Sequence, residues 1–573
     1  MPPQSEGSDL PKRSCIRCNR RKVRCDRKHP CAQCLQANAE CIHPGNKRAP
    51  RKLNRPPIAA LRTRLQQLEE EVERLQAGGK RPALRSRSAD EVDRRQPPPP
   101  HVEAKRLRGM LVVQDETRSR YVGDEASVVL RDTIPGLQEL YGHSWDREHP
   151  GPESELGVDA GRVDSLQPQQ MKTLWQVYKS NVAPMITVLH SPSIESVIGE
   201  ACATPDVELD PESAALVQTV FFAAVVSMDP AHCWSVVGEE RDVCLREFRL
   251  AVVRSLEKAD LVSSDDVRVL QAAVLYLLCL RCVCDSKQIW VEATIVVRVA
   301  QRQGIHRDGQ KLGLSPFDIE TRRRLWSYIC ILDILCSEDQ GTDTQIQPEM
   351  FDTRPPLNID SDDLSSDMTE LPSPRAGFTD ITLCIIQCEI MAHLSWTSLS
   401  FGSDGHQSSL ADEQNPLSNL AASLEERYLQ KFDLKIPIQW VTAVIFRLTL
   451  SKASLVHRLS KTAADKESTA TDDAIFNLAV EILKFASLLQ NNEMSAPWAW
   501  LCKSYKQEHA VALILSQLCS RPISPETDHA WDLVKGVYDE WQETQQTNSQ
   551  MEEPVSRLME RAKFSRRQRG AVE

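Results

Sequence analysis

The chain has 573 residues, of which 41% are hydrophobic, and a formal net charge of -11. This length predicts more than one domain and a sizeable buried core. No apolar run lies near the N-terminus, and the longest apolar stretch, residues 272–280, is too short to cross a bilayer. The sequence therefore argues against a secreted or membrane-spanning protein, and we expect a soluble intracellular one.

The charge is unevenly distributed along the chain. Residues 11–64 contain 16 Lys and Arg but only two acids, Asp26 and Glu40, which gives this segment a net charge of +14 and leaves -25 for the rest. A basic end on an acidic body predicts one nucleic-acid-binding module on a protein that otherwise does not bind nucleic acid.

Six of the 18 cysteines lie in this basic segment with the spacing C-x2-C-x6-C-x5-C-x2-C-x6-C. They are Cys15, Cys18, Cys25, Cys31, Cys34 and Cys41. Zinc takes four thiolate ligands in a tetrahedron. Six thiols fill two such shells only if two of them are shared, and then no position is left for water. The spacing therefore predicts a structural site for two zinc ions, whose binding supplies most of the folding free energy of so small a module.

The alternative, six unrelated cysteines or a disulfide knot, is disfavoured by the regular spacing and the expected intracellular location. The other twelve cysteines are scattered from Cys202 to Cys519, mostly among apolar residues. We expect them to be buried thiols that behave as small apolar side chains.

The cysteine segment resembles the binuclear Zn2Cys6 cluster of fungal transcription factors, and the match covers every cysteine. Pro30 also matches the loop proline that is common in that family. The resemblance implies that Cys15 and Cys31 bridge both ions. It further implies that Cys18 and Cys25 complete one shell, and that Cys34 and Cys41 complete the other.

Basic residues between the second and third cysteines are the expected DNA-reading elements. We expect residues 19–24 to lie on a helix fixed by two zinc ligands, with side chains that reach phosphates or the N7 and O6 acceptors of guanine. The resemblance implies that Lys22 contacts a CGG triplet and that Arg21 assists. We expect phosphate contacts from Arg20, Arg24, Arg27, Lys28, Lys47, Arg48, Arg51 and Lys52. The last four lie in a basic linker, residues 46–57, which also fits a nuclear import signal.

A heptad pattern follows the linker, after the helix-start signal Pro56-Pro57. Its apolar positions recur at intervals of three and four residues. They are Ile58, Leu61, Leu65, Leu68, Val72 and Leu75. This pattern predicts a short parallel coiled coil over residues 58–76 and hence a homodimer. The alternative is an amphipathic helix that packs on its own chain.

The rest of the chain predicts a flexible linker over 77–169, a large all-helical domain over 170–545 and a C-terminal tail over 546–573. Within the domain, apolar residues recur with helical spacing in 245–259, 267–280 and 325–335. Ser315 and Pro316 form a helix start, and Gly341 is a helix stop. The fold class is thus mostly α, with the cluster of residues 11–45 at one end.

Three segments resemble the fungal transcription factor regulatory domain, also called the middle homology region. They are Gly304-Ile-His-Arg-Asp308, the stretch from Ser315 to Trp326, and Pro356-Leu-Asn-Ile-Asp360 with Asp362-Asp363-Leu364. The single residues Asp333 and Gly341 also fit the resemblance, which spans roughly residues 175–370. The sequence departs from the family pattern at Ser327, where a second Trp is frequent. The resemblance implies a regulatory role through small molecules or partner proteins. We expect Glu320 and Arg322–Arg324 to form a surface salt-bridge network.

The predicted function is that of a zinc-dependent, sequence-specific RNA polymerase II transcription factor in the nucleus, with DNA, transcription machinery or co-regulators, and a small-molecule effector as partners. Activation of a secondary-metabolite gene cluster is favoured over nutrient regulation or repression. A zinc-dependent protein-interaction scaffold is the alternative of another class. An enzyme is not expected: His306-Arg307-Asp308 is like a kinase catalytic loop, but Gly313 stands where that loop needs Asn.

Overall fold

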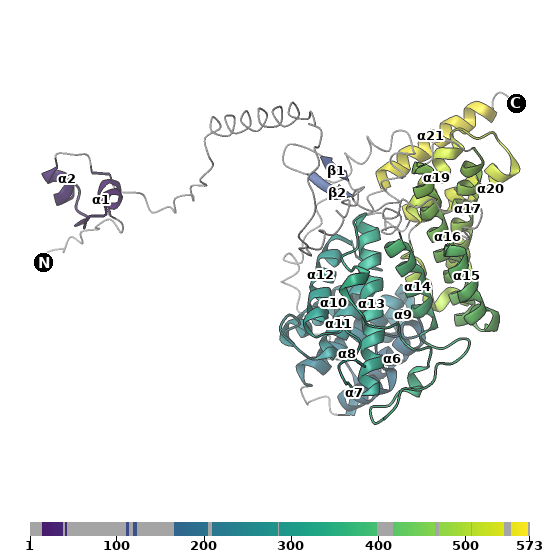
Figure 1. The fold of residues 1–573 in the computed structure, drawn as a ribbon, viewed down its shortest axis with the longest axis horizontal. Coiled ribbons are helices and arrows are strands. Elements are labelled where there is room, and N and C mark those ends of the chain that lie inside the picture. Colours follow the sequence, from purple (N-terminus) through teal and green to yellow (C-terminus); the bar gives the residue numbers. More distant parts are fainter. Residues whose placement is uncertain are drawn as a thin grey trace, which may run out of the picture. The chain divides into compact units, whose positions relative to one another are not determined.

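A computed structural model of the chain describes residues 14–37, 41–42, 110–113, 119–122, 166–203, 209–284, 286–397, 416–464, 469–505, 507–543 and 552–570. The chain divides into two compact units, Met1–Pro100 and His101–Glu573 (Figure 1). The fold is mostly α-helical, as predicted. Across the described ranges, none of the helices combines the length and the apolar character that crossing a membrane requires.

The first unit contains two short helices, α1 (Ile16–Arg21) and α2 (Ala32–Gln36). Each begins directly after a cysteine, Cys15 and Cys31, that has extended backbone angles and serves as the N-cap residue. The N–H of Ile16 donates to the carbonyl oxygen of Ile42 at 2.9 Å, which holds the far end of the module against its beginning.

The second unit starts with two short strands, β1 (Met110–Val113) and β2 (Ser119–Val122). They pair antiparallel, with Met110 opposite Val122 and Val113 opposite Ser119. The strands lie inside residues 77–169, for which the sequence analysis expected a flexible linker. Runs of four residues are too short to show the alternation that identifies a strand.

The first half of the helical body surrounds α8 and α11, whose side chains are buried almost all the way around. In chain order its helices are α6 (Pro168–Val177), the π-helix η3 (Tyr178–Val182), α7 (Ser191–Ala203), α8 (Pro211–Ser227), α9 (Pro230–Val237), α10 (Arg241–Lys258), α11 (Val267–Leu280), α12 (Ser286–Arg302) and α13 (Pro316–Gln340). The predicted helical segments 245–259, 267–280 and 325–335 are confirmed by α10, α11 and α13.

The second half packs its long helices α16 and α17 against each other and against α14 and α19 (Figure 1). Its elements are the 3-10 turns η4 (Pro348–Met350) and η5 (Ser361–Asp363), α14 (Thr382–Thr397), α15 (Pro416–Arg427), η6 (Leu429–Lys431), α16 (Pro437–Ala464), α17 (Thr469–Asn491), η7 (Glu493–Trp498), α18 (Ala499–Cys502), α19 (Glu508–Leu518), α20 (Pro525–Glu543) and α21 (Glu552–Gly570). Both halves share one continuous hydrophobic core.

Helix α21 lies within residues 546–573, which the sequence analysis treated as a tail. Its inward side chains Val555, Leu558, Met559 and Ala562 are buried. Arg569 donates to the carbonyl oxygens of residues 519 and 521, at the end of α19. The last helix is therefore part of the helical body, because its apolar face is covered.

Helix α13 has the boundaries that its capping residues predict. The Ser315 hydroxyl accepts from the N–H of Asp318 at 3.1 Å, and Pro316 occupies the first helical position. The helix ends at Gly341, whose φ of 61° lies in the left-handed region that glycine adopts without strain. Both the start and the stop of this helix are confirmed.

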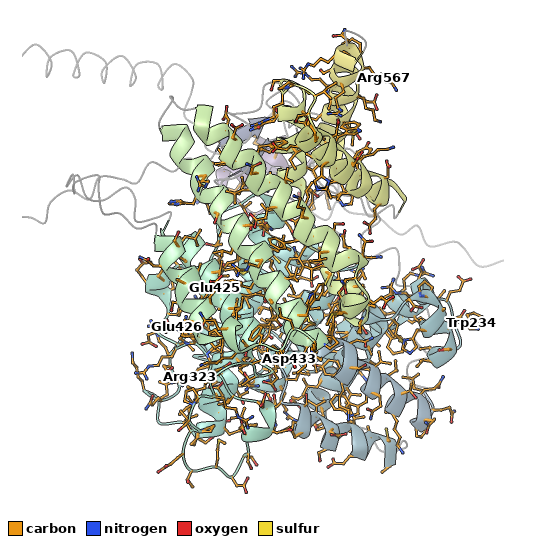
Figure 2. All side chains as sticks on the ribbon, turned by 90° about the vertical axis from the view of Figure 1, so that its right-hand side faces the viewer. Trp234, Arg323, Glu425, Glu426, Asp433 and Arg567 are labelled. Atoms are coloured by element: carbon orange, nitrogen blue, oxygen red, sulfur yellow. The ribbon has the colours of Figure 1, made fainter. Side chains whose placement is uncertain are left out.

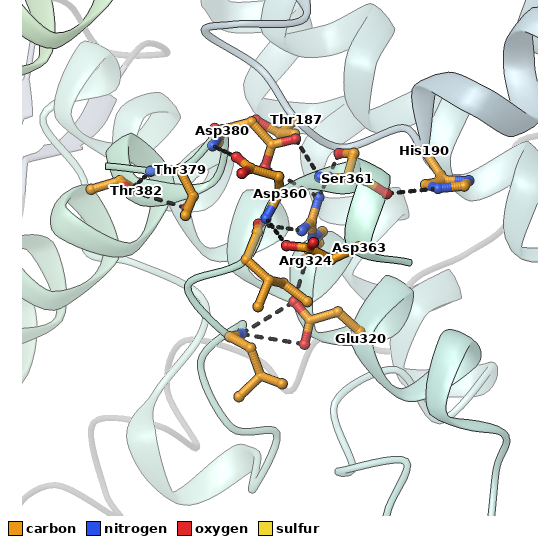
Figure 3. A network of polar contacts seen from close by, with 12 residues as sticks. Thr187, His190, Glu320, Arg324, Asp360, Ser361, Asp363, Thr379, Asp380 and Thr382 are labelled. Atoms are coloured by element: carbon orange, nitrogen blue, oxygen red, sulfur yellow. Dashed lines mark hydrogen bonds and ion pairs between the residues drawn. The ribbon is translucent and has the colours of Figure 1, made fainter. Parts of the chain in front are cut away.

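The charged residues of α13 form a buried network, so the expected surface salt-bridge network is wrong. Glu320, Arg323 and Arg324 are at most 3% exposed, and only Arg322 of this group is half-buried. Arg324 donates to Glu320 at 3.4 Å, to the hydroxyl of Ser361 at 2.9 Å and to the carbonyl oxygen of residue 359 at 3.0 Å (Figure 3). These charges are buried because α13 passes through the core and each one finds a partner there.

The same network holds the irregular segment 351–364 against α13. Glu320 accepts from the N–H of Leu357 at 3.1 Å, and the N–H of Ser361 donates to Asp380 at 2.7 Å (Figure 3). His190 contacts the carbonyl oxygen of Ser361 at 3.1 Å. Loops that enter a core need such partners for their backbone polar groups.

Candidate zinc cluster and DNA-binding surface

The six predicted zinc ligands come together in the first unit. Their sulfur atoms fall into two groups of four, each within 4.8 Å of one another, and Cys15 and Cys31 occur in both groups. The first group adds Cys18 and Cys25, and the second adds Cys34 and Cys41. All six are free thiols and all except Cys25 are buried, although residues 14–37 and 41–42, the described part of this unit, form no other apolar core.

The sulfur separations fit tetrahedral zinc. Two sulfurs bound to one ion at about 2.3 Å with tetrahedral angles lie about 3.8 Å apart. The separations are 3.7 Å between Cys15 and Cys31, 3.6 Å between Cys15 and Cys34, and 3.6 Å between Cys18 and Cys31. The donor set is entirely thiol, which suits zinc and offers no carboxylate or imidazole to a harder ion.

Backbone N–H groups point at the sulfurs and favour their charged form. The N–H of Cys18 donates to the Sγ of Cys15 at 3.4 Å and lowers the pKa of Cys15 to about 6. The N–H of Cys31 donates to the Sγ of Cys41 at 3.3 Å. Burial raises the pKa of Cys34 to about 12. Binding of a divalent cation would deprotonate such thiols, since the ion is the largest local charge.

Asp26 is a structural residue of this site that the sequence analysis did not single out. Its carboxylate accepts from the N–H of Ala32 at 3.2 Å, at the first residue of α2. An acid at a helix N-terminus satisfies an unpaired donor and interacts well with the helix dipole. The sequence signal that could have identified Asp26 is its position as an isolated acid among basic residues.

The expected helix over residues 19–24 is shorter than predicted. Helix α1 ends at Arg21, and Lys22 follows with a φ of 55° in the left-handed region. A helix from Cys18 to Cys25 would separate these residues by about 10 Å along its axis, whereas their sulfurs belong to one group within 4.8 Å. The chain therefore has to reverse between them, and Lys22 lies at that reversal.

The predicted DNA-contacting residues surround this reversal. Arg20 and Arg21 lie in α1, Lys22 caps it, and Arg24, Arg27 and Lys28 follow in the irregular segment before α2. The side chains of Arg21, Lys22, Arg24, Arg27 and Lys28 are exposed. Lys47, Arg48, Arg51, Lys52 and the coiled-coil positions Ile58, Leu61, Leu65, Leu68, Val72 and Leu75 lie outside the described residues.

Two family profiles match the chain. The fungal Zn(2)-Cys(6) binuclear cluster domain matches residues 13–50, and the fungal specific transcription factor domain matches residues 175–429. The chain belongs to the fungal Zn2Cys6 transcription factors. Members of this family are transcription factors and not enzymes, and the cluster domain binds two zinc ions through six cysteines.

Curated relatives of this Zn2Cys6 factor match along most of its length. The aurofusarin cluster transcription factor aurR2 of Gibberella zeae is 28% identical over 92% of this chain and 75% of its own. The pyriculol/pyriculariol biosynthesis cluster transcription factor 1 of Pyricularia oryzae is 27% identical over 91% and 74%. Transcriptional regulator AacuB of Aspergillus aculeatus is 24% identical over 92% and 77%.

The remaining cysteines are confirmed as packing residues. In the helical body all twelve are free thiols, and each is buried or half-buried. Burial raises the pKa of most of them, for example Cys282 to about 11 and Cys336 to about 12. Thiols of this kind are unreactive.

Proposed function

We propose that this Zn2Cys6 factor reads CGG-type half-sites as a homodimer and regulates a pathway-specific gene set. The observation that carries the proposal is the pair of four-cysteine groups that share Cys15 and Cys31, with basic side chains at the chain reversal beside them. In this proposal the cluster is the structural support, and the exposed cations provide affinity and base selectivity.

Shared ligation by Cys15 and Cys31 is the assignment that best accounts for two complete shells. Cys18 and Cys25 would then complete the first shell, and Cys34 and Cys41 the second. Membership of both sulfur groups supports the bridging role, since a bridging sulfur must lie close to the other ligands of both ions.

Base reading is assigned to Lys22 with help from Arg21. Two features support the assignment: both side chains are exposed, and Lys22 lies where α1 ends and the backbone turns away. A cation there can approach guanine N7 and O6 without the rest of the helix in its path. Arg20, Arg24, Arg27 and Lys28, followed by Lys47, Arg48, Arg51 and Lys52, are assigned to phosphates, which supply affinity without sequence information.

Dimerisation is assigned to residues 58–76. One module reads about three base pairs, and pairing two modules is how such proteins gain specificity. The heptad positions from Ile58 to Leu75 supply the interface in this proposal. The competing assignment is an amphipathic helix that packs on its own chain.

The regulated genes are proposed to form a secondary-metabolite cluster, with this protein acting in the nucleus as their activator. Two of the relatives carry biosynthetic-cluster names, which supports this pathway class over nutrient use. The helical body, about residues 170–570, is proposed to respond to a partner or small effector, as is implied for this family.

Selection from random double-stranded DNA with the zinc-loaded full chain tests the proposal. Enrichment of two CGG triplets at one fixed spacing is expected. Enrichment of one triplet alone would keep the cluster assignment and contradict the dimer. No enrichment, with two zinc ions bound per chain, would favour the zinc-dependent protein-interaction scaffold instead.

A further inference from the structure

Cys25 is the one member of the cluster that solvent can reach in the described part of the first unit. It is half-buried, whereas the other five cluster cysteines are at most 6% exposed. The sulfur group that contains Cys18 and Cys25 therefore has an accessible member, and the group that contains Cys34 and Cys41 has none. The two zinc shells that these groups predict thus differ in their access to solvent and to reagents.

The backbone also holds Cys25 less firmly than Cys41, its counterpart in the second group. The N–H of Cys31 donates to the Sγ of Cys41 at 3.3 Å, whereas none of the described backbone N–H groups donates to the Sγ of Cys25. Lys22 and Arg27 flank Cys25 with φ values of 55° and 62°, in the left-handed region that costs free energy for residues other than glycine. Both features make Cys25 the easiest of these ligands to release.

A peroxide reacts with a cysteine that is both accessible and in its thiolate form. Cys25 meets both conditions, because a cysteine that binds zinc is deprotonated. The twelve other cysteines lie among the side chains of the helical body that Figure 2 shows, and each is buried or half-buried. Burial raises the pKa of the half-buried Cys282 to about 11 and raises that of Cys519, so both stay protonated near pH 7. Cys284, which accepts from Arg249 at 3.7 Å, is the strongest competitor in this body.

We propose that Cys25 is a peroxide-sensitive site that opens the first zinc shell and leaves the second intact. The Cys25 thiolate attacks one oxygen of hydrogen peroxide, the O–O bond breaks, and the sulfur becomes a sulfenic acid while hydroxide leaves. The Cys18 thiolate, in the same group within 4.8 Å, then attacks the Cys25 sulfur, forms a disulfide and displaces a second hydroxide. The two thiolates lose two electrons, the peroxide gains them, and both hydroxides take protons from water.

The shared ligands predict how much zinc this reaction releases. Once Cys18 and Cys25 are joined, the first shell retains only Cys15 and Cys31, which are two of its four ligands, and it can no longer hold its ion. The second shell keeps all four of its sulfurs. One of the two ions is therefore lost for each disulfide formed, a stoichiometry that rests on the shared ligation in the proposed function.

The test treats the full chain, loaded with two zinc ions, with graded amounts of hydrogen peroxide. A zinc-binding dye measures the released metal, and mass spectrometry of the alkylated, digested chain locates the disulfide. We expect release of one ion per chain with a disulfide between Cys18 and Cys25, and dithiothreitol with added zinc should restore the second ion. These readouts are metal and sulfur, so they do not depend on whether the chain reads CGG sites.

Matched variants separate Cys25 from the other thiols. Cys25→His keeps a zinc ligand, since imidazole binds zinc, but removes the sulfur that is oxidised, and should slow the release about ten-fold or more. Cys41→His makes the same change in the second shell and should leave the rate unchanged, as should Cys284→Ser. Alkylation of the unaltered chain with limiting N-ethylmaleimide needs no substitution, and Cys25 should be the first cluster cysteine modified.

Four results would overturn the proposal. The first is the release of both ions together, and the second is no release of zinc at all. The third is a disulfide or a first alkylation at another cluster cysteine. The fourth is a Cys25→His chain that binds two ions and loses zinc to peroxide as fast as the unaltered chain.

Discussion

The buried ion pair between Asp308 and Arg323 contributes a stability that can be measured. Arg323 donates from Nε and Nη2 to the two carboxylate oxygens at 2.9 and 3.0 Å, and the side chains are 3% and 1% exposed. In Arg323→Ala the carboxylate stays in the interior with only the N–H groups of Gln310 and Arg354 as donors. Removing one partner of such a pair costs about 3–5 kcal/mol, so we expect a loss of that size in the free energy of unfolding.

Arg307→Ala is the matched control, because it removes the same side chain next to Asp308 in the sequence. Arg307 pairs with Asp352 at 3.7 Å, and the two side chains are 46% and 33% exposed. A solvent-screened pair of this kind is worth about 0.2–1 kcal/mol. Each variant removes one positive charge, so the predicted difference between their losses of unfolding free energy comes from the burial of the Asp308–Arg323 pair.

The assay is equilibrium urea unfolding of the full chain with saturating zinc, followed by far-UV circular dichroism at pH 7. Burial alone would raise the pKa of the Asp308 carboxyl, but Arg323 and the N–H of Arg354 hold it below its ordinary value. A carboxyl of lowered pKa stabilises the fold above its unfolded-state pKa, and that contribution is lost as the pH falls through the folded-state value. At pH 7 the contribution is complete.

A double variant tests whether the two side chains act as a pair. Once Asp308 is also replaced by Ala, no uncompensated charge remains, so the double variant should lose about 1–3 kcal/mol less than the sum of the single variants. The reasoning would be refuted by an Arg323→Ala loss no larger than that of Arg307→Ala, or by strictly additive losses.

Three further predictions concern the cluster, base reading and pH. Cys31→Ser removes a member of both sulfur groups and should abolish zinc binding, whereas Cys18→Ser should retain about one ion per chain. Mass spectrometry of the metal content measures both variants, and equal losses of zinc would contradict the shared-ligand assignment. Lys22→Ala should weaken binding to the preferred DNA site by about 1–3 kcal/mol and relax base preference in gel-shift titrations. Equal weakening of binding to all DNA sequences would make Lys22 a phosphate contact. Burial raises the pKa of Glu320 to about 7. Between the unfolded-state pKa and this value, the Glu320 carboxyl is protonated in the folded state and ionised in the unfolded state. Stability should therefore fall by about 3 kcal/mol as pH rises from about 4.5 to 7. Glu320→Gln should remove that slope in urea unfolding at graded pH, and an unchanged slope would contradict it.

The cysteine cluster was predictable because its information is local. Six ligands within 27 residues, spaced as two similar halves, leave few ways to coordinate zinc. The end of α1 at Lys22 was missed, although the distance limit between Cys18 and Cys25 already required a reversal. The reversal was not predicted because Arg and Lys favour helix.

Helix boundaries in the body were predictable where capping chemistry marks them, as at Ser315 and Gly341. The segment 267–280 was correctly predicted to be a helix, α11, because a run of apolar residues at helical spacing indicates a buried helix. Helix α21 was missed as part of the body, since its sequence is strongly polar and only one narrow face is covered.

The burial of the charged residues of α13 could not be predicted from local sequence patterns. From the sequence, Glu320, Arg323 and Arg324 are expected at the surface, because charged side chains usually lie there. Their partners lie 15 to 37 residues away, at Asp308, Leu357 and Ser361. Burial here depends on tertiary pairing, which composition and periodicity do not report.

Those partners join the three segments that resemble the fungal regulatory domain. Asp308 of the first pairs with Arg323 of the second, and Arg324 of the second donates to the carbonyl oxygen of Ile359 in the third. The buried charged residues of these segments, Asp308, Glu320, Arg323 and Arg324, thus have their partners inside the protein, and a ligand would have to break these bonds to reach them. This indicates that they stabilise the fold, and that regulatory partners are to be sought at solvent-facing sites of the helical body.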